Sequence, residues 1–317
     1  MAESKFPSEV IDLPSEGKLY PKEHPCSNGK IEIKYMTAKE EDILTSQNLI
    51  KKGVVIDRLM DSLILTPGVK SDDLILGDKS AVMVAARVLA YGPEYTCEVT
   101  TPTGKKINKT FNLADCPFKK VPNEITENKF EVTLPISKKK VTFKLLTGKE
   151  EILINEELKA SEKINAEVKP ELTTRLRHTI ISVDGDDSQA TINNFVQNLL
   201  ARDSMHLRSE IREVTPDIEL SQEIEIEGES VKVDIPMTVG FFWLTPQDKP
   251  KLHEQIFQLM YYGKGFIHSD VYNMPVYLRN FYYKQLSDTR TKENEQIKKA
   301  NQRSKVSKPS INPRFKR

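Results

Sequence analysis

The stretch that decides the fold class is Leu76–Leu113, LGDKSAVMVAARVLAYGPEYTCEVTTPTGKKINKTFNL. Its first half repeats small and apolar residues at helical spacing, with Asp78 placed to cap the helix and Gly92 placed to end it. From Glu94 the apolar period falls to two residues on both sides of a TPTG turn, which is typical of an antiparallel β-hairpin. A core helix that leads directly into a hairpin predicts an α+β protein.

The same two periods recur on either side of this stretch. Alternation predicts a strand over 30–36 and hairpins over 130–145 and 224–235, the last with Gly228-Glu229 in a type II′ turn. Thr37 and Glu40 form a capping box that predicts the start of a helix. Helical spacing predicts further helices over 54–63, 149–163 and 171–213. The predicted fold class is α+β: antiparallel β-hairpins with packed helices, then a small all-helical C-terminal module and a disordered basic tail.

Composition changes along the chain predict its domain organisation. Residues 1–29 are rich in proline and form an extended arm that must lie against another part to be ordered. The α+β body spans 30–245, either undivided or as two lobes over 30–148 and 149–245. An aromatic-rich helical module follows over 246–287, with Ser269 able to cap a short helix and Pro275 able to begin the next. Residues 288–317 form a solvated helix that fades near Arg303 into the disordered tail.

Overall composition places the chain among soluble, intracellular proteins. Its 317 residues are 38% hydrophobic and 29% charged, and no apolar run approaches the roughly 20 residues that span a bilayer. No secretory signal follows the N-terminus, and three unpaired cysteines do not form a disulfide framework. The net charge of +1 combines +7 after residue 287 with 1 − 7 = −6 before it. We therefore expect a cytoplasmic protein with a mildly acidic body and a basic tail.

Motifs for catalysis, metals or nucleotides are incomplete in this sequence. Around Gly77 the pattern of a phosphate-binding loop is interrupted by Asp78, whose carboxylate would repel phosphate. The Asp184–Asp187 run lacks the rest of a calcium-binding loop and is better explained as a turn. The histidines show no metal-binding spacing, and no motif supports a catalytic triad. We expect no catalytic residues, no metal and no cofactor, so the protein is predicted not to be an enzyme.

The segment Gly240–Leu286 concentrates the aromatic residues. It contains the only tryptophan and more than half of the tyrosines, together with Met and Arg, the residue types that protein interfaces favour. The alternative is that many of these rings form the core of a small helical unit. The rings for which both explanations apply are Phe257, Tyr261, Tyr262, Phe266, Phe281 and Tyr282.

Several long runs carry a resemblance to a known family. They include DLPSEGKLYP, IEIKYMTAKEEDIL, LILGDKSAVMVAAR, TFKLLTGKEE, NLLARDS, VTPDI, GFFW and YYGKGF with VYNMPVYLRNFY. On these runs the chain resembles the base-plate hub assembly proteins of T-even-type contractile-tailed phages, over nearly its whole length. The part from His253 to Leu286 is similar to the downstream part of tail assembly chaperones, which hold the tape-measure protein. The resemblance implies a role in building the hub at the tail tip.

Together these patterns favour a non-enzymatic phage tail assembly factor that helps assemble the base-plate hub and chaperones the tape-measure protein. Its partners would be other base-plate hub proteins and the tape-measure protein, in the host cytoplasm or in the virion tail base plate, with no membrane. One alternative is a permanent structural subunit of the hub; another, less favoured, is nucleic-acid binding through the basic tail. The candidate partner-binding residues are Phe241, Phe242, Trp243, Tyr261, Tyr262, Phe266, Tyr272, Pro275, Arg279 and Tyr282.

Overall fold

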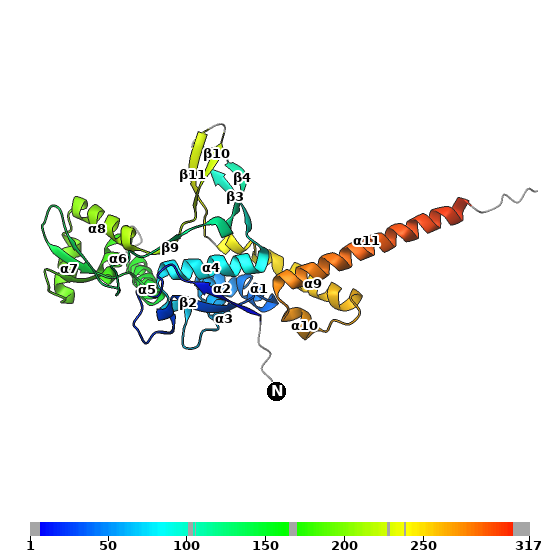
Figure 1. The fold of residues 1–317 in the computed structure, drawn as a ribbon, viewed down its shortest axis with the longest axis horizontal. Helices are drawn as coiled ribbons and strands as arrows, with labels where there is room; N and C mark the ends of the chain where they lie inside the picture. The colour runs from blue at the N-terminus through cyan, green and yellow to red at the C-terminus, as the bar shows by residue number, and fades with distance from the viewer. Residues whose placement is uncertain are drawn as a thin grey trace, which may run out of the picture.

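A computed structural model describes residues 7–100, 104, 106–164, 170–226, 229–237 and 239–306. The molecule is elongated, with a central body, a lobe of helices and strands at one end, and a helical module at the other (Figure 1). Two hairpins project together from the same side of the body (Figure 1). Helices and small antiparallel sheets alternate along the chain, which confirms the predicted α+β class.

The N-terminal segment is part of the central body. Strand β1 (Ser8–Asp12) pairs antiparallel with β2 (Lys30–Lys34), and a short 3-10 helix, η1 (Pro25–Asn28), lies between them. Leu13, Leu19 and Cys26 are buried in the main core. Gly17 makes this path possible, because its φ is +78° and an added Cβ would lie 2.4 Å from the carbonyl oxygen of Ser27.

Four helices build the centre of the body. They are α1 (Ala38–Leu44), α2 (Gln47–Lys52), α3 (Val55–Leu63) and α4 (Leu76–Tyr91). The capping box at Thr37 and Glu40 is present at the start of α1, as predicted. The short η2 (Ser71–Asp73) precedes α4.

Asp78 does not cap α4, contrary to the prediction. The helix begins at Leu76, and Asp78 lies inside its first turn, fully buried. Its carboxylate accepts hydrogen bonds from the backbone N–H of Ser15 at 2.9 Å and from the hydroxyl of Tyr20 at 2.7 Å. Burial raises the pKa of this carboxyl above its ordinary value. Asp78 therefore ties the N-terminal segment to α4, a task that sequence spacing does not reveal.

The predicted hairpins are present. β3 (Glu94–Thr100) pairs with β4 (Lys106–Asn112), and β10 (Ser221–Ile226) pairs with β11 (Glu229–Asp234), both antiparallel. Residues 101–103 of the predicted TPTG turn (101–104) lie outside the described residues. The prediction of Gly228-Glu229 as the turn of the other hairpin was wrong, because Glu229 already belongs to β11, where it pairs with Ile226. Residues 227 and 228 lie outside the described residues. Near the hairpin bases run η3 (Leu113–Asp115) and the short pair β5 (Phe118–Lys119) and β9 (Asp217–Ile218).

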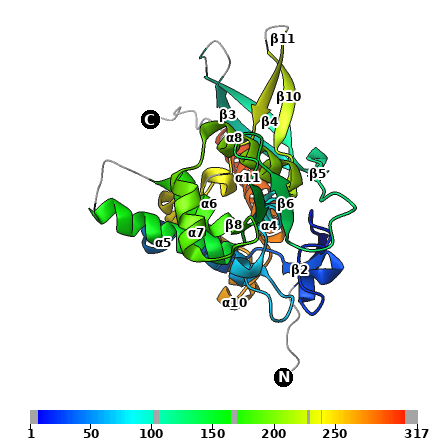
Figure 2. The same ribbon diagram turned by 90° about the vertical axis from the view of Figure 1, so that its left-hand side faces the viewer.

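The lobe contains a three-stranded sheet and four helices. Its sheet has the order β6 (Phe130–Thr133), β7 (Lys140–Phe143) and β8 (Ile180–Val183). Its helices are α5 (Gly148–Ile164), α6 (Glu171–Thr179), α7 (Gln189–Gln197) and α8 (Ala201–Val214), which face the viewer in Figure 2. The prediction of helix over 171–213 was wrong at β8, because Ile180–Val183 complete the sheet edge beside β7.

The C-terminal module contains three helices. After η4 (Val239–Phe242) and η5 (Pro246–Asp248) come α9 (Lys249–Tyr262), α10 (His268–Tyr272) and α11 (Val276–Val306). Ile267, not Ser269, occupies the N-cap of α10, and α11 begins after Pro275 as predicted. α11 continues through the predicted boundary at residue 288 as one 31-residue helix, which leaves the body in Figure 1. It includes residues 304–306, which were predicted to be disordered; the rest of the tail lies outside the described residues.

Candidate functional site

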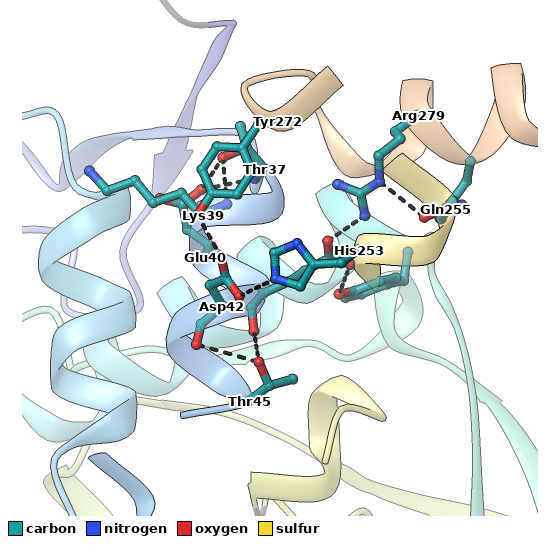
Figure 3. Close-up of polar contacts among 12 residues, drawn as sticks. Thr37, Lys39, Glu40, Asp42, Thr45, His253, Gln255, Tyr272 and Arg279 are labelled. Carbon is teal, nitrogen blue, oxygen red and sulfur yellow. Dashed lines mark hydrogen bonds and ion pairs between the residues drawn. The ribbon is translucent and has the colours of Figure 1, made fainter. Parts of the chain in front are cut away.

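The candidate site is the C-terminal module and its junction with α1 (Figure 3). The capping box fixes the start of α1, and the Glu40 carboxylate also accepts hydrogen bonds from Lys34 Nζ at 2.7 Å and Ser62 Oγ at 2.6 Å. These bonds anchor α1 in the body, so the next two residues, Glu41 and Asp42, are held in place to meet the module.

Glu41 forms a buried ion pair with Arg279 of α11. The Arg279 Nη2 donates to the Glu41 carboxylate, and its Nε donates to Gln255 Oε1 at 3.1 Å (Figure 3). Tyr91 also donates to Glu41, at 3.1 Å. Burial raises the pKa of Glu41, and the neighbouring guanidinium opposes this shift by favouring the carboxylate. The pair joins α1, α9 and α11 at one point.

Asp42 makes the second polar connection. Its Oδ2 accepts a hydrogen bond from the Tyr272 hydroxyl at 2.6 Å, and its Oδ1 lies 3.1 Å from Lys249 Nζ and 3.4 Å from His253 Nε2. Burial acts to raise the pKa of Asp42, but hydrogen bonds from Tyr272 and Lys249 prevail and lower it. Burial and the bond to Asp42 raise the pKa of Tyr272 to about 12. One carboxylate thus fastens both α9 and α10 to α1.

An apolar seam lies beside these polar contacts. Its buried members are Ala38 of α1 together with Leu252, Ile256, Leu259 and Val271 of the module. Phe266, Tyr272, Tyr283 and Leu286 pack against this cluster from partly exposed positions. The module contributes three buried residues of α9 and one of α10 to this seam, and the polar contacts of Glu41 and Asp42 lie beside it.

Five aromatic rings of α9 and α11 are exposed. Phe257 is 57% exposed, Tyr261 66%, Tyr262 42%, Phe281 53% and Tyr282 37%. We call these five residues the aromatic face. Phe257 stacks on Tyr261 with centroids 5.5 Å apart, and Tyr282 contacts both Phe281 and the half-buried Phe266. The idea that these rings form the core of the module was therefore wrong for the aromatic face, because Leu252, Ile256 and Leu259 occupy the inward stripe of α9.

The predicted contact residues divide into two groups. Tyr261, Tyr262 and Tyr282 belong to the aromatic face, and Trp243 is 47% exposed nearer the body. Phe241, Phe242, Pro275 and Arg279 are buried, while Phe266 and Tyr272 are half-buried and serve the module's own packing. Sequence reasoning left Phe257 and Phe281 off the contact list, although Phe257 lies four residues before Tyr261 and so shares its side of α9.

Trp243 and its neighbours reinforce the root of the first hairpin. The Arg87 guanidinium lies 4.2 Å from the centre of the Trp243 ring and donates to the carbonyls of Phe241, Gly92 and Glu94. Trp243 also stacks on Tyr95 with centroids 5.7 Å apart. Phe241 and Phe242 pack inside the main core. Phe241, Phe242 and Trp243 therefore all support the fold, although part of the Trp243 ring stays exposed.

The site offers surface for contact with other proteins, and the described residues contain no group of three or more His, Cys, Asp or Glu that could hold a metal ion. No helix within the described ranges is both long and apolar enough to cross a bilayer. Contiguous exposed apolar surface of this kind is typical of sites of protein–protein contact.

Comparison with known proteins identifies the family. The model of the family described as T4 bacteriophage base plate protein matches residues 7–243, and the chain belongs to this family. No curated protein and no solved structure matches the chain significantly. The protein therefore has a structural or assembly role in the phage tail base plate, alongside other base-plate proteins. The matched region ends at Trp243, just before the C-terminal module.

Proposed function

We propose that the protein is a non-enzymatic assembly factor of the base-plate hub that holds the tape-measure protein through the aromatic face. The observation that carries this proposal is five exposed rings on α9 and α11 of a module whose own core is formed by other residues. Rings of this kind bind an amphipathic helix by burying its apolar stripe. A long helical client with apolar stripes needs such cover until it is assembled.

The polar junction supports this proposal by fixing the module. Glu41 and Asp42 together contact four module residues, so α9 and α11 present their rings at a defined place on the body. A preorganised binding surface loses less conformational entropy on binding than a flexible one, so it binds its partner more tightly. Deleting the whole module would uncover buried Glu41, so point substitutions give the cleaner test.

The test is co-expression of the tape-measure protein with a variant carrying Phe257→Ser, Tyr261→Ser and Phe281→Ser. Each lost ring is expected to cost about 1–2 kcal/mol of binding free energy, which together amounts to a hundredfold or more in affinity. The soluble fraction of the client should fall accordingly. The matched control is Met205→Ser on α8, which changes an equally exposed apolar side chain on the lobe. An unchanged soluble client with the triple variant would defeat the proposal.

A permanent subunit of the hub is the second candidate, and family membership favours it. Mass spectrometry of purified particles and of infected-cell lysate separates the two candidates. An assembly factor should be abundant in lysate and scarce in particles, whereas a subunit should be present in particles at fixed stoichiometry. We propose the host cytoplasm as the place of action of the assembly factor.

A further inference from the structure

A second feature lies at the other end of the molecule, where the lobe meets the body. A cavity of about 190 Å³ opens between the start of α4, the segment after β7, α6 and α8. Its wall is formed mainly by Leu145, Leu146, Leu176 and Ile211. Leu172, at the start of α6, is 44% exposed and also lines the cavity.

The size of this cavity fits one large side chain. An apolar cavity of roughly 150 Å³ is enough to bind benzene, whereas sites for drug-sized ligands and cofactors usually measure about 300–1,000 Å³. The lining is chiefly aliphatic, so an occupant would gain from transfer out of water. A phenyl ring or a branched aliphatic side chain meets both requirements.

Three cationic side chains line the cavity, and they differ in whether a carboxylate neutralises them. Lys144 Nζ is paired with Glu150 at 2.6 Å, and Arg175 donates to both oxygens of Glu151 at 2.8 and 2.9 Å. Arg208 differs, because its Nε donates only to the backbone carbonyl of Ser204 at 3.3 Å. Within the part of the chain that the structure describes, no carboxylate pairs with Arg208. Its guanidinium is left to bind an anion beside the cavity.

We propose that this cavity receives a large apolar side chain of a partner protein, and that Arg208 binds a carboxylate next to that side chain. The combination specifies a short segment such as Phe-Glu or Leu-Asp. A protein partner is favoured because members of this family work among other base-plate proteins. The chain's own last residues are a poor occupant, because 307–317 carry four basic residues and no acid. The proposal is independent of the aromatic face.

The experiment titrates the full chain with acetyl-Phe-Glu-amide and follows the methyl resonances of Leu146, Leu176 and Ile211 by NMR. Acetyl-Phe-Gln-amide is the neutral match, and acetyl-Ala-Glu-amide lacks the ring. The first probe should shift these methyl resonances and bind about fivefold more tightly than the neutral match, the ratio that roughly 1 kcal/mol produces. The alanine probe should leave the resonances unchanged.

Two variants separate the parts of the proposal. Arg208→Gln should reduce binding of the Phe-Glu probe to the level of the Phe-Gln probe, while Arg202→Gln, outside the cavity on the same helix, should have no effect. Leu172→Trp should fill the opening and abolish binding of both ring-containing probes. No methyl shift with any probe, or binding that survives Leu172→Trp, would overturn the site. Equal binding of the Glu and Gln probes would overturn the role of Arg208.

Discussion

Replacing Arg279 by leucine should weaken the junction between α1 and the module more than any other single change there. The side chain of Arg279 is 1% exposed and that of Glu41 is 7% exposed, so Glu41 would become a buried charge without its counter-ion. Breaking a buried pair in this way costs about 3–5 kcal/mol. The hydrogen bond to Gln255 is lost as well, while that from Tyr91 remains.

The loss of stability caused by Arg279→Leu should increase as pH rises. Burial already raises the pKa of Glu41, and removing the guanidinium, which favours the carboxylate, raises it further. The folded variant then binds more protons than the unfolded chain, so its stability falls as pH rises above the ordinary glutamate value of 4.5. The difference from the wild-type protein should therefore be larger at pH 8 than at pH 5.

Urea unfolding followed by the fluorescence of Trp243, the only tryptophan, measures this difference. Hydrogen exchange at the amides of α9 and α11 shows whether the module detaches first. Glu41→Gln combined with Arg279→Leu should recover much of the lost stability, because no buried charge remains. An Arg279→Leu variant whose free energy of unfolding lies within about 1 kcal/mol of wild type would refute the electrostatic account. A double variant no more stable than Arg279→Leu alone would refute it as well.

Two further changes test other contacts. Gly77→Ala should lower the free energy of unfolding by about 1–3 kcal/mol, because the new Cβ would lie 1.8 Å from the Pro216 carbonyl oxygen. The measurement is the thermal midpoint of unfolding. A midpoint equal to that of the wild-type protein would contradict the close approach of α4 to the residue before β9. Asp42→Asn should reduce the loss of stability on acidification below pH 4. The lowered pKa of Asp42 means that its contribution is present at neutral pH and lost as pH falls, so parallel stability curves for variant and wild type would exclude that contribution.

Local patterns were enough to predict much of the fold. The two-residue period identified both projecting hairpins and the β6–β7 pair, because alternation reports directly on a strand with one buried face. The capping box at Thr37 identified the start of α1, because both of its hydrogen bonds form within four residues. These features depend on neighbours in the sequence.

Features that depend on distant parts of the chain could not be predicted in the same way. Asp78 has the spacing of a cap, but its partners Ser15 and Tyr20 lie about sixty residues earlier. Periodicity also shows which residues share a side of a helix without showing which side is covered. Phe241 and Tyr261 are both aromatic residues of the segment Gly240–Leu286, yet Phe241 is buried in the body and Tyr261 is 66% exposed.

The unbroken course of α11 has a mechanical consequence. At 1.5 Å per residue its 31 residues extend about 46 Å, and they start at the junction that Arg279 fastens to α1. A tilt of roughly ten degrees at that fulcrum would swing the far end of this rod by about 8 Å. A protein bound to the outer turns of α11 would therefore act on the junction with α1 from a long distance. Conversely, a small rotation at that junction would produce a large displacement at the far end of the helix.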